Sequence, residues 1–85
     1  MVKTFKISFE DSPGRYVINA PIIRIVDDGA HTEYTFEAAR IEGVRIVDVF
    51  TGDIFKITKY TEGFDPELQR DTLFIVEELE KCSET

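Results

Sequence analysis

The sequence predicts an α+β domain in which a bent antiparallel sheet of five strands is covered by one C-terminal helix. Three observations lead to this prediction. Apolar and polar residues alternate along much of the first sixty residues, as they do in half-buried strands. Turn residues separate these runs at short intervals. After residue 64 the apolar residues recur every three to four positions, which is typical of a helix with one buried face.

The length and the composition are those of a single folded domain. The chain has 85 residues, of which 42% are hydrophobic and 32% are charged, a normal mixture for a globular protein. We therefore treat residues 1–85 as one domain. In this prediction residues 1–60 form the β-meander, and residues 64–82 form an amphipathic C-terminal helix.

The first strand shows the clearest alternation. Phe5, Ile7 and Phe9 are separated by polar residues, so all three are expected on the buried face. The run stops at residues 11–14, where proline followed by glycine predicts a type II turn. A hairpin to the next strand follows from this turn.

The second strand is expected to run from residue 16 to residue 26 as one long, bent strand. Pro21 interrupts it, and proline cannot donate a hydrogen bond within a sheet. A one-residue bulge near Pro21 would return Ile23 and Ile25 to the core side.

The third strand follows a turn at Asp27–Ala30, where aspartate and glycine between two extended runs favour a hairpin. Alternation over residues 31–38 places Tyr34, Phe36 and Ala38 on the buried face.

The remaining two strands are expected at residues 44–50 and 54–60, with a tight turn at Thr51–Asp53 between them. The first of these is apolar on both sides, which indicates a central or doubly covered strand. In the second, Phe55 and Ile57 share one face. Short connections favour a meander of sequential neighbours, and the bend could also curl the sheet into a partial barrel.

The C-terminal helix is predicted from its start signals and from its apolar stripe. Asp65 is a suitable N-cap and Pro66 suits the first helical position. The stripe would cover the phenylalanines of the open sheet face. Its members are Leu68, Thr72, Leu73, Ile75, Val76, Leu79 and Cys82.

Charge is concentrated in the same C-terminal segment. The whole chain has a formal net charge of −7. Residues 64–85 contain seven acids and two bases, a net charge of −5. Ordered carboxylates on one face favour a protein partner with a basic surface. The candidate partner-binding residues are Asp71, Glu77, Glu78 and Glu80.

No catalytic motif is found. The chain has one cysteine, one histidine, no phosphate-binding glycine loop and no serine in a nucleophile motif. The sequence therefore predicts a small, acidic, non-enzymatic interaction or regulatory protein without a cofactor. Its negative charge argues against nucleic-acid binding. No apolar stretch reaches the length of a membrane span, the N-terminus lacks the apolar run of a signal peptide, and a cytoplasmic location is expected.

Three alternatives remain open at this point. A small-ligand or metal-binding domain could be organised around Asp48, an acid within the most apolar strand, or around the Asp27–Glu33 turn, which also contains Asp28 and His31. A structural subunit of a larger assembly is a second alternative. A homodimer formed through an exposed sheet edge is a third.

Overall fold

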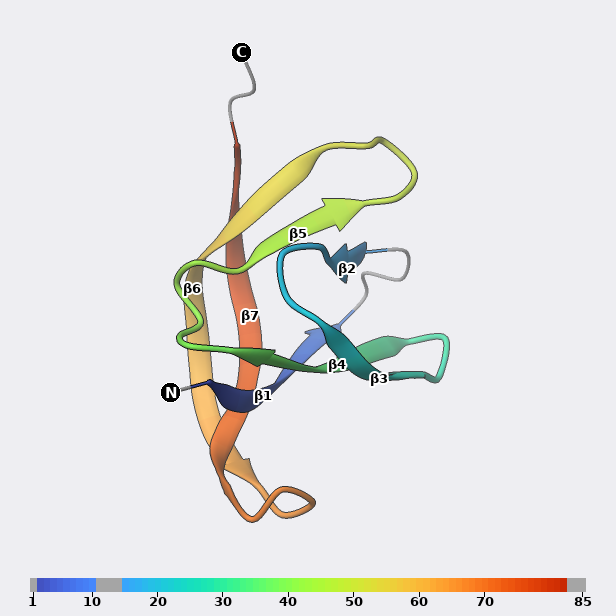
Figure 1. Cartoon of the computed structure of the whole chain (residues 1–85). Helices are drawn as coiled ribbons and strands as arrows, with labels where there is room; N and C mark the ends of the chain where they lie inside the picture. Colours follow the sequence, from blue (N-terminus) through green and yellow to red (C-terminus); the bar gives the residue numbers. More distant parts are fainter. Residues whose placement is uncertain (1, 11–14, 83–85) are drawn as a thin grey trace.

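The computed structural model describes residues 2–10 and 15–82, and in these residues the chain is all-β (Figure 1). The predicted α+β class is therefore wrong, because the described residues contain no helix. It follows that none of them belongs to a helix that could cross a membrane. The seven strands are β1 (Lys3–Glu10), β2 (Arg15–Val17), β3 (Ile22–Asp27), β4 (His31–Ala38), β5 (Arg45–Asp48), β6 (Ile54–Asp65) and β7 (Arg70–Lys81).

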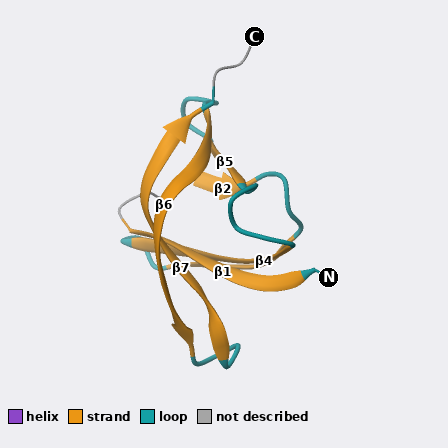
Figure 2. Ribbon diagram, turned by 90° about the vertical axis from the view of Figure 1, so that its left-hand side faces the viewer, coloured by secondary structure: helices purple, strands orange, loops and turns teal. Residues whose placement is uncertain are grey.

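The strands form one sheet in the order β2-β5-β6-β7-β1-β4-β3, which is not the expected five-stranded meander. β1 lies between β4, to which it is antiparallel, and β7, to which it is parallel. The two end strands, β2 and β3, are consecutive in the chain. Because only residues 18–21 connect these two strands, the ends of the sheet lie near each other, and the sheet curls into a nearly closed barrel (Figure 2).

The predicted C-terminal helix is in fact the end of β6, a tight turn and β7. Asp65 Oδ1 accepts hydrogen bonds from the backbone N–H groups of Glu67 (2.9 Å) and Leu68 (3.4 Å). An N-cap side chain makes the same kind of bonds, so the local signal fits both structures. Gln69 has a φ of 54°, which ends the turn in a left-handed conformation and returns the chain as a strand.

The spacing of apolar residues that predicted a helix arises from irregular pairing between β6 and β7. Thr72 and Phe74 point inward from β7, and Phe74 is only 3% exposed, whereas Ile75 is 38% exposed. Val76 and Leu79 both pack against the core, although they are three residues apart. The register between β6 and β7 shifts in this stretch, and a bulge changes which residues face inward.

The core is built around the inward face of β1. Phe5, Ile7 and Phe9 are buried, as the alternation predicts. The ring centroid of Phe5 lies 5.9 Å from that of Phe36 and 5.2 Å from that of Phe74. A residue of β7 thus covers the phenylalanines that the helix was expected to cover. The other buried apolar residues are Val17, Tyr34, Ile41, Val44, Ile46 and Ile57.

The expected second strand is two strands, β2 and β3, at opposite ends of the sheet. The bulge expected near Pro21 lies within β3, between Ile22 and Arg24. Ile22 packs against the core, but Ile23 and Ile25 are 57% and 55% exposed. Neither isoleucine is buried, although Ile25 lies opposite the buried Tyr34 on the same face of the sheet, because β3 is an end strand with no neighbour beyond it in the described sheet.

The turn at Gly29 agrees with the sequence prediction. The backbone N–H of Asp28 donates to the carbonyl of His31 at 3.1 Å, and Gly29 adopts a φ of 89°, which favours glycine. The predicted turn at residues 11–14 lies outside the described residues.

Candidate functional site

The four acids predicted to bind a partner all lie exposed on β7. A strand rises by about 3.3 Å per residue, so Asp71 and Glu80 are separated by roughly 30 Å rather than grouped on one helical face. Asp71 lies next to the turn, and Glu80 lies toward the other end of the hairpin. Of the four acids, the structure brings Glu77 and Glu78 to a common feature, a pocket beside β7.

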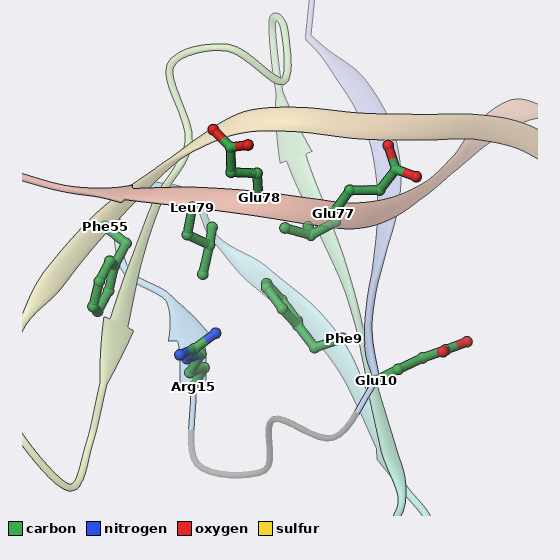
Figure 3. A pocket seen from close by; sticks show the side chains of 8 residues that line it. Phe9, Glu10, Arg15, Phe55, Glu77, Glu78 and Leu79 are labelled. Carbon is green, nitrogen blue, oxygen red and sulfur yellow. The ribbon is translucent and has the colours of Figure 1, made fainter.

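This pocket has a volume of about 340 Å³ and opens where β1 and β7 separate (Figure 3). The two strands are paired only from Lys6 to Ser8, which face Leu73 to Ile75. Beyond these residues, parts of four strands surround the opening. Its lining consists of Phe9 and Glu10 from β1, Arg15 from β2, Phe55 from β6, and Val76, Glu77, Glu78 and Leu79 from β7.

The lining includes both apolar and acidic residues, and most of its accessible surface is polar. Labelled apolar side chains and Arg15 converge on one space in Figure 3, whereas three carboxylates point away from it. We call these carboxylates the acidic rim, which consists of Glu10, Glu77 and Glu78. All three are exposed. Glu10 was not among the residues singled out from the sequence, because it is far from the other two along the chain.

The charge on β7 is partly balanced by lysines of β6. Lys59 Nζ lies 4.0 Å from Glu77 Oε2, and Lys56 Nζ lies 3.9 Å from Glu80 Oε1. Exposed ion pairs of this kind contribute at most about 1 kcal/mol, so they leave the carboxylates available. Residues 54–82 contain seven acids and four bases, a net charge of −3. The β6–β7 hairpin is therefore acidic, but its net charge is smaller in magnitude than the −5 of residues 64–85.

Arg15 connects the pocket to Asp48, the acid that suggested a ligand site. The Arg15 guanidinium carbon lies 5.4 Å from the centroid of the Phe55 ring, and its Nε lies 3.9 Å from Asp48 Oδ2. Asp48 Oδ1 accepts hydrogen bonds from the backbone N–H groups of Phe50 (2.9 Å) and Thr51 (3.4 Å). These bonds give Asp48 a structural role, which is to cap the turn between β5 and β6.

The Asp27–Glu33 turn is likewise occupied by its own hydrogen bonds. Asp28 Oδ1 accepts from the backbone N–H groups of Ala30 and His31, which lowers the pKa of Asp28. The His31 ring lies 3.3 Å from Asp28 and 3.1 Å from Glu33, through different nitrogens. In the part of the chain that the structure describes, no three histidine, cysteine or acidic side chains are grouped to hold a metal ion.

A second charged site lies on the outer face of β1, and sequence analysis missed it. Lys6 Nζ is 3.0 Å from Glu67, 3.1 Å from Asp65 and 3.3 Å from Glu33. Arg24 also pairs with Glu67. We call Lys6, Glu33, Asp65 and Glu67 the Lys6 cluster; it borders a second pocket, of about 330 Å³. No local pattern could indicate a cluster whose members are so far apart in the chain.

Burial disfavours the charged forms of Lys6 and Asp65, but contacts within the cluster outweigh this effect. Hydrogen bonds to Glu67 and Asp65, together with the nearby charge of Glu33, raise the pKa of Lys6 above its ordinary value of 10.5. Hydrogen bonds from Lys6 and from the backbone of Glu67 and Leu68 lower the pKa of Asp65 below 3.8. A protonated amine is a poor nucleophile, so the cluster is suited to fastening the hairpin turn onto β1.

Comparisons with protein-family models, with curated proteins and with solved structures find no match for this chain. No activity, ligand or partner can therefore be carried over from a relative.

Proposed function

We propose that this domain is a non-enzymatic interaction protein that binds a basic segment of a partner protein across the acidic rim. The observation that carries the proposal is that exposed carboxylates from two strands, β1 and β7, border one partly apolar pocket. A lysine or arginine side chain has an aliphatic stem and a charged end. Its stem would lie against the apolar lining, and its charge would lie near Glu10, Glu77 or Glu78.

Two further features support this kind of partner. The net charge of −7 attracts a basic surface at long range and accelerates the encounter. The stacking of Arg15 over Phe55 is an intramolecular example of a guanidinium held against the aromatic wall of the pocket. A partner arginine would use the same chemistry on the neighbouring apolar surface.

The proposal places the protein in a reducing compartment, the cytoplasm, and gives it a regulatory role by binding. The single cysteine, Cys82, is free. The single histidine, His31, is held between two carboxylates of its own turn. Neither residue is placed with a second catalytic group at the acidic rim, so binding rather than chemistry is the proposed activity.

Neutralising the acidic rim is expected to weaken binding of a basic peptide about tenfold, because three favourable charge contacts of about 0.5 kcal/mol each are lost. The probe is a short arginine-rich peptide labelled with fluorescein, and its affinity is measured by fluorescence anisotropy at about 0.1 M salt. The variant carries Glu10→Gln, Glu77→Gln and Glu78→Gln together.

The control makes the same change in net charge at exposed glutamates that do not line the pocket: Glu37→Gln, Glu42→Gln and Glu62→Gln. We expect this control to lose less than about twofold in affinity, because only long-range attraction changes. Equal losses in the two variants would show that net charge, and not the rim, governs binding.

A further inference from the structure

β3 lies at one end of the sheet and presents an apolar edge. Within the described part of the chain it pairs with β4 only. Ile23, Ile25 and Val26 are all exposed in this short strand. Proteins usually protect such edges with charges, prolines or covering segments, because an unpaired strand is a template for another strand. The edge is therefore a candidate interaction surface separate from the acidic rim.

The register between β3 and β4 determines which backbone groups face this edge. Asp28 and His31 close the hairpin through a backbone hydrogen bond. Hydrogen-bonded and non-hydrogen-bonded pairs alternate along antiparallel strands, so Val26 is hydrogen-bonded to its β4 partner. The N–H and C=O groups of Ile25 and Asp27 consequently point away from β4, toward the open edge.

We propose that two copies of this chain associate by antiparallel pairing of their β3 strands about a two-fold axis at Val26. Ile25 of each copy then exchanges backbone hydrogen bonds with Asp27 of the other. The two Val26 residues face each other as a non-hydrogen-bonded pair, with their Cα atoms about 4.5 Å apart. The two-fold axis limits the assembly to two copies, and the open β3 edge of each copy is then paired with that of the other.

Charge complementarity identifies a second copy as the partner. β3 and its turn carry a base, Arg24, at one end and an acid, Asp28, at the other. Antiparallel self-pairing about Val26 places Arg24 of one copy opposite Asp28 of the other, on the same face of the joined sheet. Arg24 is 56% exposed while it pairs with Glu67, and Asp28 is 61% exposed while it bonds within its own turn, so both side chains have room for a second contact. The inference does not depend on the proposed function.

A cysteine at the axis tests both the dimer and its register. In a Cys82→Ser background, Val26→Cys places two thiols at a separation that a disulfide can bridge. We expect oxidised glutathione to convert most of this variant to a disulfide-linked dimer, seen by mass spectrometry under non-reducing conditions. The matched control is Val49→Cys in the same background, since Val49 is similarly exposed but lies outside β3. The control should remain largely monomeric.

Sedimentation of the unmodified chain provides the second measurement. We expect a dimer at about 1 mM protein that dissociates on dilution, and a monomer at the same concentration for Val26→Lys, whose charges repel across the axis. Val26→Lys should keep its affinity for the arginine-rich peptide, which separates this inference from the proposed function. A monomeric parent chain, or equal crosslinking of the two cysteine variants, would overturn the proposed dimer.

Discussion

Lys6→Met is expected to lower the free energy of unfolding by about 3–5 kcal/mol, because it leaves the Asp65 carboxylate buried without its cation. The side chains of Lys6 and Asp65 are only 12% and 2% exposed. Urea unfolding followed by circular dichroism measures the change. Lys3→Met, at an exposed position of the same strand, is the control, and we expect it to change stability by less than about 0.5 kcal/mol.

A double variant separates the buried charge from other effects of the substitution. Asp65→Asn removes the negative charge but keeps a side-chain oxygen that can accept the backbone hydrogen bonds of the turn. Combined with Lys6→Met, it should recover part of the lost stability, because the one fully buried carboxylate of the cluster is then neutral. If Lys6→Met is no more destabilising than Lys3→Met, the cluster does not fasten the hairpin turn.

The same cluster makes a defined contribution to the pH dependence of stability. Contacts with Lys6 and Arg24 lower the pKa of Glu67 below 4.5, and the pKa of Asp65 is lowered below 3.8. Their contribution is therefore complete above these values and is lost as the pH falls through the lowered pKa values. The pKa of Lys6 is raised, so its contribution is complete below 10.5 and is lost only at higher pH. The stability difference between the parent chain and Lys6→Met should be largest between about pH 5 and 10.

Phe74→Ala is expected to lower the free energy of unfolding by about 3–5 kcal/mol, because it opens a cavity among the core aromatic rings. The Phe74 ring contacts those of Phe5 and Tyr60, with centroid distances of 5.2 and 5.1 Å. Ile75→Ala removes a neighbouring side chain that points outward and should have an effect of about 1 kcal/mol or less.

The contrast between these two positions distinguishes a strand from the helix that the sequence suggested. The expected helical stripe includes Ile75 and omits Phe74, so a helix would reverse the order of the two effects. If Phe74→Ala does not fold, Phe74→Leu, which removes less volume, should still be more destabilising than Ile75→Ala. Denaturant unfolding of the three variants gives the order directly.

Local patterns predicted the inward faces of single strands well. Strict alternation identified the buried apolar residues of β1 and β4, because a period of two depends only on adjacent residues, but it did not identify the buried Ser8, Thr32 and Thr35. The turn at Gly29 was also predictable, since its backbone conformation depends on residue type. Which strands pair with each other was not predictable in this way. β1 pairs with β7 from the other end of the chain, and no local signal specifies that contact.

The C-terminal segment shows why the remaining prediction failed. Its start signal is chemically real, since Asp65 accepts the hydrogen bonds of a cap, but a hairpin turn needs the same bonds. The spacing of three and four residues between its apolar side chains arises where the register between β6 and β7 shifts at a bulge. The β-branched and aromatic residues within 72–76 favour a strand, in agreement with the structure.

Only part of the candidate site could be predicted from the sequence. Glu77 and Glu78 were identified from the local density of acids, but Glu10 joins them only because β1 and β7 are neighbours in the sheet. The Lys6 cluster depends on the same long-range pairing. Asp71, which a helix would have placed near Glu78, lies along the strand toward the turn.

The central claim is that residues 70–81 form a strand that places Glu77 and Glu78 beside β1, where Glu10 completes the acidic rim. Nuclear magnetic resonance on the ¹³C- and ¹⁵N-labelled chain tests this claim most directly. We expect strand-type Cα and Cβ shifts over these residues and cross-strand contacts between the backbone protons of Ile7 and Phe74, which are paired in parallel. Helical shifts with sequential amide contacts over residues 70–81, and none to β1, would contradict it.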